Sequence, residues 1–331
     1  MRLRGRGTLG GTTALAASLL WASGAFPPAQ VAHPVGGGCG VVIFDLYPHG
    51  DHMHVADYHP VVGDGDGDGD GDGCGDPVFL DDETLLFVVF PSSSAEDAQE
   101  RGSEAGLPRV VVHRLSGSLP DAGTGRREDE ATPGLNPRPT PDGTAFSFIR
   151  PAHLGWSGRL HRRAPGQEAS VPLIPEVDDV MGHEWMDDST LVLMREGSPG
   201  VLWVADLEVG ELRQVGRGVL HGLERIPGEA AVTFVELDGD RSWVRRMDSA
   251  AESPSTLVDT PPGSREHAWM PPGVLGPGAA LVMGHEGVLY RFEPGADRFW
   301  HPIVNLNAYT GSFTGVSVSP SGLRVAVVEG G

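Results

Sequence analysis

The sequence predicts an all-β fold, a six-bladed β-propeller that is closed by strands from both ends of the chain in one shared blade. First, one strand–turn–strand unit recurs at a period of about 40 to 60 residues. Second, the last copy stops after two strands, while an unpartnered strand lies near the N-terminus. Third, 39% apolar and 21% charged residues are enough for a core, and one β architecture can include all 331 residues.

The chain begins with the pattern of a secretory signal peptide. Three arginines in the first six residues precede an apolar stretch over 12–21, and small residues follow at 22–25. The stretch is shorter than the roughly 20 apolar residues of a membrane-spanning helix, and no later segment reaches that length. We therefore assign 1–25 to a signal peptide and 26–331 to the propeller, and expect an exported protein, periplasmic or extracellular, with no membrane span.

Six copies of the repeat follow, each joining a short strand to a β-branched apolar strand through a turn rich in Asp, Pro and Gly. They begin at residues 76, 136, 182, 222, 267 and 315. Third strands are expected at 201–211, 242–251 and 287–296, and more variable fourth strands at 212–216 and 298–304. Six copies predict six blades.

The two ends of the chain complement each other. The copy at 315–328 has only two strands, whereas 40–49 reads as a third strand with no first strand before it. Pairing them closes the ring and hides strand edges that would otherwise invite aggregation. We expect 40–62 and 315–328 to form one blade.

The turn sequences carry a family resemblance. TPDG at 140–143, SPSG at 319–322 and the degenerate LDDE and MDDS resemble the WD40-like (PD40) repeats of TolB-like six-bladed β-propellers, over nearly all of 26–331. This resemblance implies a protein-binding module, a gating domain of a peptidase or, less often, an enzyme, and the fold does not choose among them. The α/β domain of TolB and the GxSxG motif of the peptidases have no counterpart here, so neither a Tol–Pal role nor serine hydrolysis is expected.

The charge balance narrows the function further. The chain holds 45 acidic and 24 basic residues for a net charge of −21, and every basic residue is arginine. No basic surface is available for nucleic-acid phosphates or an anionic bilayer, so we expect no nucleic-acid partner. Without lysine, no Schiff base can form. Carboxylates, histidines and a bound metal are what remains for chemistry.

Two short patterns on first strands of the repeat are candidates for a site. His183 and His267 each stand two residues before a tryptophan and share a strand face with it. Innermost strands line the propeller channel, where polar groups from several blades converge. A ligand site at the channel mouth would then contain Arg138, His183, Glu184, Arg225, Glu266 and His267. The alternative, which the spacing favours, is that each Trp packs between blades beside a buried, hydrogen-bonded His.

Two further segments contain potential metal ligands. The Gly-Asp run at 63–75 has the alternation of an early calcium loop but lacks the acid at its twelfth position, so it predicts a solvated loop that binds calcium weakly or not at all. Its acids are Asp64, Asp66, Asp68, Asp70 and Asp72. Histidines at 49, 52, 54 and 59 lie near Asp51 and Asp57; solvation on an outer strand is favoured there over a transition-metal site. No other cofactor is predicted.

The two cysteines, Cys39 and Cys74, flank one local segment near the expected mature N-terminus. Export to an oxidising compartment favours a disulfide between them. Two free buried thiols are the alternative, and Cys39 stands too far beyond the apolar stretch for the usual lipoprotein pattern.

These observations favour an exported, monomeric, non-enzymatic binding propeller that presents its loops and channel mouth to a protein or small polar ligand. The alternative is a metal-dependent hydrolase or lyase with its ion in the central channel.

Overall fold

The computed structural model describes 40–62, 73–90, 107–115, 130–151, 156–197, 200–239, 241–251 and 253–329. All of these residues belong to one compact unit, 31–331. Within them the structure contains 23 strands and no helix, and therefore no helix that could cross a membrane. The predicted all-β class is confirmed for this part of the chain.

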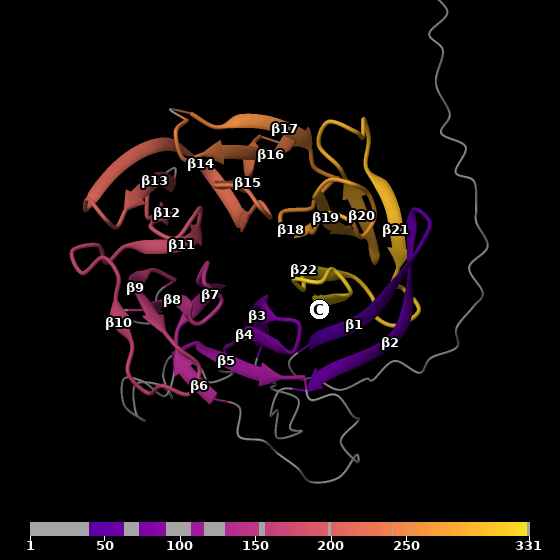
Figure 1. Ribbon diagram of the computed structural model, residues 1–331, viewed down its shortest axis with the longest axis horizontal. Helices are drawn as coiled ribbons and strands as arrows, with labels where there is room; N and C mark the ends of the chain where they lie inside the picture. The colour runs from indigo at the N-terminus through magenta and orange to yellow at the C-terminus, as the bar shows by residue number, and fades with distance from the viewer. Residues whose placement is uncertain are drawn as a thin grey trace, which may run out of the picture. The chain divides into compact units, whose positions relative to one another are not determined.

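The strands form four antiparallel sheets (Figure 1). The first, in the order β2-β1-β23-β22, contains β1 (Gly40–His49), β2 (His52–Val62), β22 (Phe313–Val318) and β23 (Arg324–Glu329). The second contains β3 (Gly73–Asp81), β4 (Thr84–Phe90), β5 (Arg109–Arg114) and β6 (Glu130–Pro133). The third contains β18 (His267–Met270), β19 (Ala280–His285), β20 (Val288–Phe292) and β21 (His301–Asn305).

The fourth sheet has 11 strands. They are β7 (Leu135–Pro139), β8 (Phe146–Pro151), β9 (Gly158–Arg163), β10 (Val171–Pro172), β11 (Val180–Trp185), β12 (Thr190–Arg195), β13 (Gly200–Asp206), β14 (Glu211–Arg225), β15 (Ala231–Asp238), β16 (Arg241–Asp248) and β17 (Ser255–Asp259).

The arrangement of the sheets is that of a propeller. The strands β3, β7, β11, β14, β18 and β22 each contact the next, and β22 contacts β3, so these innermost strands form a closed cycle (Figure 1). The second strands of the repeat read as nearly continuous apolar runs and are buried over most of their length, as in TLLFVVF and FSFIRP. Because neighbouring sheets cover both faces of these strands, no polar face is needed.

The two ends of the described chain pair in one sheet, as predicted. β1 lies antiparallel to β23, from Val41 opposite Val328 to Asp45 opposite Arg324. Arg324 also donates a hydrogen bond from Nε to Oδ1 of Asp45 over 2.7 Å. Strands far apart in sequence therefore complete one sheet and cover each other's edges.

The six copies of the repeat do not appear as six separate sheets. The 11-stranded sheet holds three of them, because β14 runs without interruption from its pairing with β13, which ends at Gly218, to its pairing with β15, which begins at Val219. β11 joins β9 through a single residue pair, Val180 and Gly158. The structure thus has four separate sheets among the described residues, and the predicted six blades do not appear as six sheets.

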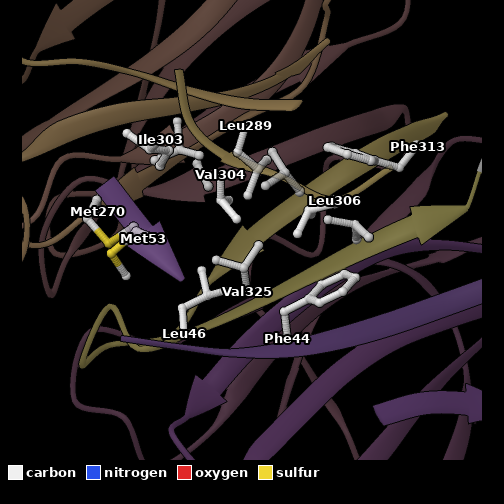
Figure 2. Close-up of a cluster of buried hydrophobic side chains, with 14 of the residues drawn as sticks. Phe44, Leu46, Met53, Met270, Leu289, Ile303, Val304, Leu306, Phe313 and Val325 are labelled. Carbon is white, nitrogen blue, oxygen red and sulfur yellow. The ribbon is translucent and has the colours of Figure 1, made fainter. Parts of the chain in front are cut away.

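Apolar side chains fill the spaces between sheets. In one cluster, Phe44 and Leu46 of β1 pack with Leu289 of β20 and Val325 of β23 (Figure 2). All four are at most 4% exposed. Each such side chain contributes roughly 1.5–3 kcal/mol through its removal from water. This packing attaches the sheet that contains both terminal segments to the sheet of β18–β21.

Several sequence predictions concern residues outside the described part of the chain. They include the signal peptide at 1–25, the carboxylates from Asp64 to Asp72, and Cys39. Cys74 on β3 is disulfide-bonded, but its pairing with Cys39 stays a prediction. Calcium binding by the Gly-Asp run likewise stays untested.

Candidate functional site: the channel and its mouth

The repeats place two rings of residues around the propeller axis. We call the residues two positions before the turn of each repeat the channel ring. Its members are Val78, Arg138, Glu184, Glu224, Ala268 and Ser317. Two positions earlier lies the mouth ring, formed by Asp76, Asn136, Gly182, Gly222, Glu266 and Gly315. Five mouth-ring residues line one cavity and four channel-ring residues line another, so both rings face the interior of the cycle.

Arg138 of β7 holds the centre of the channel ring. Its Nε lies 3.0 Å from Oε2 of Glu184 on β11, and its Nη2 lies 3.3 Å from Oε1 of Glu224 on β14. Nη2 also donates to the carbonyl of Leu223 over 3.1 Å, and Nη1 to that of Pro137 over 3.2 Å. The side chains of Arg138 and Glu184 are each only 6% exposed. One guanidinium thus bridges three successive innermost strands.

The carboxylates near Arg138 outnumber the positive charge. Although burial disfavours its charge, the carboxylates of Glu224, Glu184, Asp76 and Glu266 raise the pKa of Arg138. Burial raises the pKa of Glu184 and of Glu224, against the attraction of Arg138. Burial and the neighbouring Asp76 raise the pKa of Glu266 to about 7. Burial likewise raises the pKa of Asp76. Four acids share one buried arginine, so this end of the channel is electronegative once the pH exceeds their raised pKa values.

A cavity of about 310 Å³ opens at the mouth ring. Its polar wall contains Asp76, Asn136, Arg138 and Glu266. Its apolar wall includes Phe90 and Trp156, whose ring centroids lie 5.4 Å apart, together with Met181 and Met194. Trp156 is 66% exposed. An exposed aromatic ring therefore lies at the edge of a cavity that also contains carboxylates.

A second cavity, of about 290 Å³, lies beyond the channel ring and is lined by Glu224, Arg225, Ser317 and three turn prolines, among others. Arg138 lines the first cavity and Glu224 the second. The Arg138–Glu224 ion pair consequently lies between the two cavities.

His183 and His267 occupy equivalent positions with nearly identical surroundings. Nε2 of His183 lies 2.6 Å from Oγ of Ser147, which also accepts a hydrogen bond from Nε1 of Trp185 over 2.9 Å. Nε2 of His267 lies 2.7 Å from Oγ1 of Thr233, which accepts from Nε1 of Trp269 over 2.8 Å. In each case one hydroxyl connects a His and a Trp to the neighbouring copy of the repeat, an arrangement that fits the packing alternative.

Each hydroxyl also donates to a backbone carbonyl, Ser147 to Arg138 and Thr233 to Glu224, both over 3.3 Å. Since a hydroxyl has one hydrogen, all three of its contacts form together only if the histidine donates from Nε2. Nδ1 is then a bare acceptor, and neither His183 nor His267 has a hydrogen-bond partner there. Burial and the charge of Arg138 lower the pKa of both rings, that of His267 to about 3, so both are neutral.

The backbone at the mouth ring adopts an unusual conformation. Asp76, Asn136 and Gly222 have φ of 48°, 47° and 49°, in the left-handed region that Asn, Asp and Gly tolerate best. Asn136 Oδ1 accepts a hydrogen bond from the backbone N–H of His183 over 3.2 Å. The side chain of Asn136 thus links β7 to β11, the next innermost strand.

The structure groups most of the sequence-predicted site residues. Arg138 and the four acids around it, Asp76, Glu184, Glu224 and Glu266, form one acidic cluster. His183 and His267 are adjacent in sequence to Glu184 and Glu266. Arg225 lies on the side of the second cavity, although its charge still lowers the pKa of Glu184. Two members were missed, Asp76 and Glu224. Alignment of the six repeats would have revealed them, because they occupy the columns of Asn136 and Arg138.

The histidine-rich segment forms the hairpin of β1 and β2. His49 Nδ1 lies 3.3 Å from His54 Nε2, and Tyr47 stacks on His54 with ring centroids 5.3 Å apart. His59 Nε2 contacts Asp45 Oδ2 over 3.1 Å. Among the residues that the structure describes, no group of three or more His, Cys, Asp or Glu side chains is placed to hold a metal ion.

Comparisons with solved structures find similar propellers. The putative TolB from Agrobacterium tumefaciens is 12% identical to this chain and superposes with a TM-score of 0.55. The match covers 88% of this chain and 97% of that protein. A chain in the nidogen/laminin complex is 9% identical, with 85% and 99% covered and a TM-score of 0.53. TolB from Acinetobacter baumannii is 14% identical over 88% of this chain, with a TM-score of 0.49, and the match spans 64% of that TolB.

No family model and no curated protein matches the sequence. At this low identity the structural likeness defines the fold alone. The chain is a β-propeller with a TolB-like arrangement of strands.

Proposed function

We propose that this protein is a non-enzymatic binding propeller whose mouth cavity takes a small polar ligand or a single side chain of a protein partner. One observation carries the proposal: the cavity of about 310 Å³ combines convergent polar groups from successive innermost strands with an exposed aromatic edge. Concave sites with a few fixed polar groups and apolar walls are the usual form of ligand sites.

The interior of the channel supports binding rather than turnover. The buried histidines are neutral and hydrogen-bonded through Nε2, and the ion pairs of Arg138 engage the nearest carboxylates. Rigid groups of this kind hold a shape around an occupant. The hydroxyls of Ser147 and Thr233 each lie beside a histidine, but both pairs are buried and each histidine donates from Nε2, so neither ring is placed to act as the base of a nucleophile.

The proposal includes six PD40-type blades. The closed cycle of six innermost strands supports this count, and so do the change of partner within β14 and the single residue pair between β11 and β9. Export to the periplasm or cell exterior is proposed from the sequence at 1–25. The proposed propeller is a monomer.

Isothermal titration calorimetry with benzyl alcohol, benzylamine, benzoate and glucose tests the binding site. We expect at least one probe to bind the full chain and to lose at least tenfold in affinity in Trp156→Ala, because the exposed ring forms the edge of the cavity. Phe299→Ala is the matched control, since Phe299 is 75% exposed but does not line the cavity. If no probe shows Trp156-dependent binding, the proposal is wrong.

A further inference from the structure

We propose, resting on the function above, that the mouth cavity selects an organic cation, an ammonium or guanidinium group carried on an apolar body. The carboxylates of Asp76 and Glu266 receive the charged end, and Phe90 and Trp156 hold the apolar part.

The two mouth carboxylates have no counter-charge of their own. Asp76 on β3 and Glu266, directly before β18, both line the cavity, and neither makes an ion pair within the described part of the chain. The guanidinium of Arg138 is already engaged by Glu184 and Glu224. An anion entering the cavity would meet uncompensated negative charge, whereas a cation would balance it.

Two side-chain acceptors pack closely against Gly222, which lines the cavity. A Cβ at Gly222 would lie 3.2 Å from Oε2 of Glu266 and 3.3 Å from Nδ1 of His267. His267 is 1% exposed, and Nδ1 has no hydrogen-bond partner. His267 does not line the cavity, so the acceptor that a bound cation meets at this wall is the carboxylate of Glu266.

The opposite wall suits the rest of such a ligand. Phe90 and Trp156 are aromatic residues of the lining that suit apolar groups or a cation over a ring face, and Met181 and Met194 are adaptable apolar neighbours. A hard inorganic cation prefers oxygen ligands and would leave the apolar surface of these four side chains unused. The combination therefore points to an organic cation of modest size, either a free amine or the side chain of a bound peptide.

Calorimetry at pH 8 with three probes that share a phenyl ring and differ in the charge of the polar group tests this selectivity. We expect benzylamine to bind at least tenfold more tightly than benzyl alcohol, and benzoate not to bind. Asp76→Asn keeps a residue that tolerates positive φ, and Glu266→Gln keeps the side-chain shape; each should weaken benzylamine binding about tenfold. Glu208→Gln, at an exposed acid outside the cavity, should leave it unchanged.

Two outcomes overturn the cation inference: benzyl alcohol or benzoate binding as tightly as benzylamine, or benzylamine binding that is unaffected in both acid variants. If Trp156→Ala still weakens the bound probe, the proposed mouth site stands while its selectivity is wrong. If no probe depends on Trp156, both proposals fail. The affinities of N-acetyl-lysine amide and butylamine, measured in parallel, distinguish the two sources of the cation. Tighter binding of the lysine derivative indicates a peptide side chain, and tighter binding of butylamine indicates a free amine.

Discussion

The two halves of the channel ring share a backbone but differ in chemistry. On β7, β11 and β14 the ring positions hold Arg138, Glu184 and Glu224 in one ion-pair cluster. On β18, β22 and β3 the equivalent positions hold Ala268, Ser317 and Val78. Ser317 Oγ accepts a hydrogen bond from the backbone N–H of Phe79 over 3.3 Å, and the other two are apolar. The propeller closes equally well through a charged half and a neutral half.

This difference indicates that the charged half is not required for the architecture. Desolvating an ion pair costs about as much free energy as the attraction between its charges returns. Uncharged residues in the neutral half therefore cost the fold no stability. The mouth ring is reversed, since its acids belong to the neutral half: Asp76 lies on β3 and Glu266 directly before β18. The charged residues of the two rings therefore lie on different halves of the propeller. The mouth carboxylates belong to one ring, and the guanidinium of Arg138 belongs to the other.

The largest effect is expected for Arg138→Met, which leaves Glu184 and Glu224 buried without their cation. Such a change costs about 3 to 5 kcal/mol in the free energy of unfolding, measured by chemical denaturation at pH 8. Arg162→Met is the control, because its pair with Asp142 is exposed, and it should cost less than about 1 kcal/mol.

The combination Arg138→Met, Glu184→Gln and Glu224→Gln makes the charged half neutral. It should recover most of the stability that Arg138→Met loses, because no buried charge remains in the channel ring. A triple variant as unstable as the single one would show that the cluster is structurally necessary.

The next effect concerns the hydroxyl behind Glu224. Thr233→Val leaves Nε1 of Trp269 and Nε2 of His267 without their partner, which should lower the free energy of unfolding by about 2 to 3 kcal/mol. Thr256→Val on the exposed face of β17 is the matched control and should change little. Equal denaturation midpoints for the two variants would contradict the structural role of the His–Trp pairs.

Glu266→Gln should change the pH dependence of stability. The pKa of Glu266 is raised to about 7 from an ordinary 4.5, so the folded state binds its proton more tightly and stability falls as pH rises between these values. The glutamine variant should match the parent near pH 4 and exceed it by about 1 to 2 kcal/mol at pH 8. Thermal unfolding across pH 4–8 checks this, with Glu208→Gln as control; parallel curves for all three proteins would refute it.

The smallest effect is expected in the neutral half. Ser317→Ala removes one hydrogen bond between β22 and β3 and should cost about 1 kcal/mol in chemical denaturation. A loss as large as that of Arg138→Met would erase the distinction between the two halves.

Much of the fold could be read from the sequence. Turn residues and β-branched runs are local signals, so the strand–turn–strand copies and the pairing of 40–49 with 315–328 were predictable. The columns of the repeat also mark which residues share a ring, which is why Arg138, Glu184 and Glu266 were found. The sheet count was not predictable, because a break between sheets depends on whether a strand such as β14 continues past its turn, a matter of backbone geometry.

The sequence by itself determined the all-β class, the repeat and the acidic character of the chain, since each is a property of composition or local pattern. Only the tertiary structure decided which charges meet. Arg138, Glu184 and Glu224 come from strands about 40 residues apart, and their ion pairs, the burial that raises the pKa of the acids and the bare Nδ1 of His267 all depend on packing around the ring. Side-chain chemistry at a site depends on distance and desolvation, which a linear sequence does not contain.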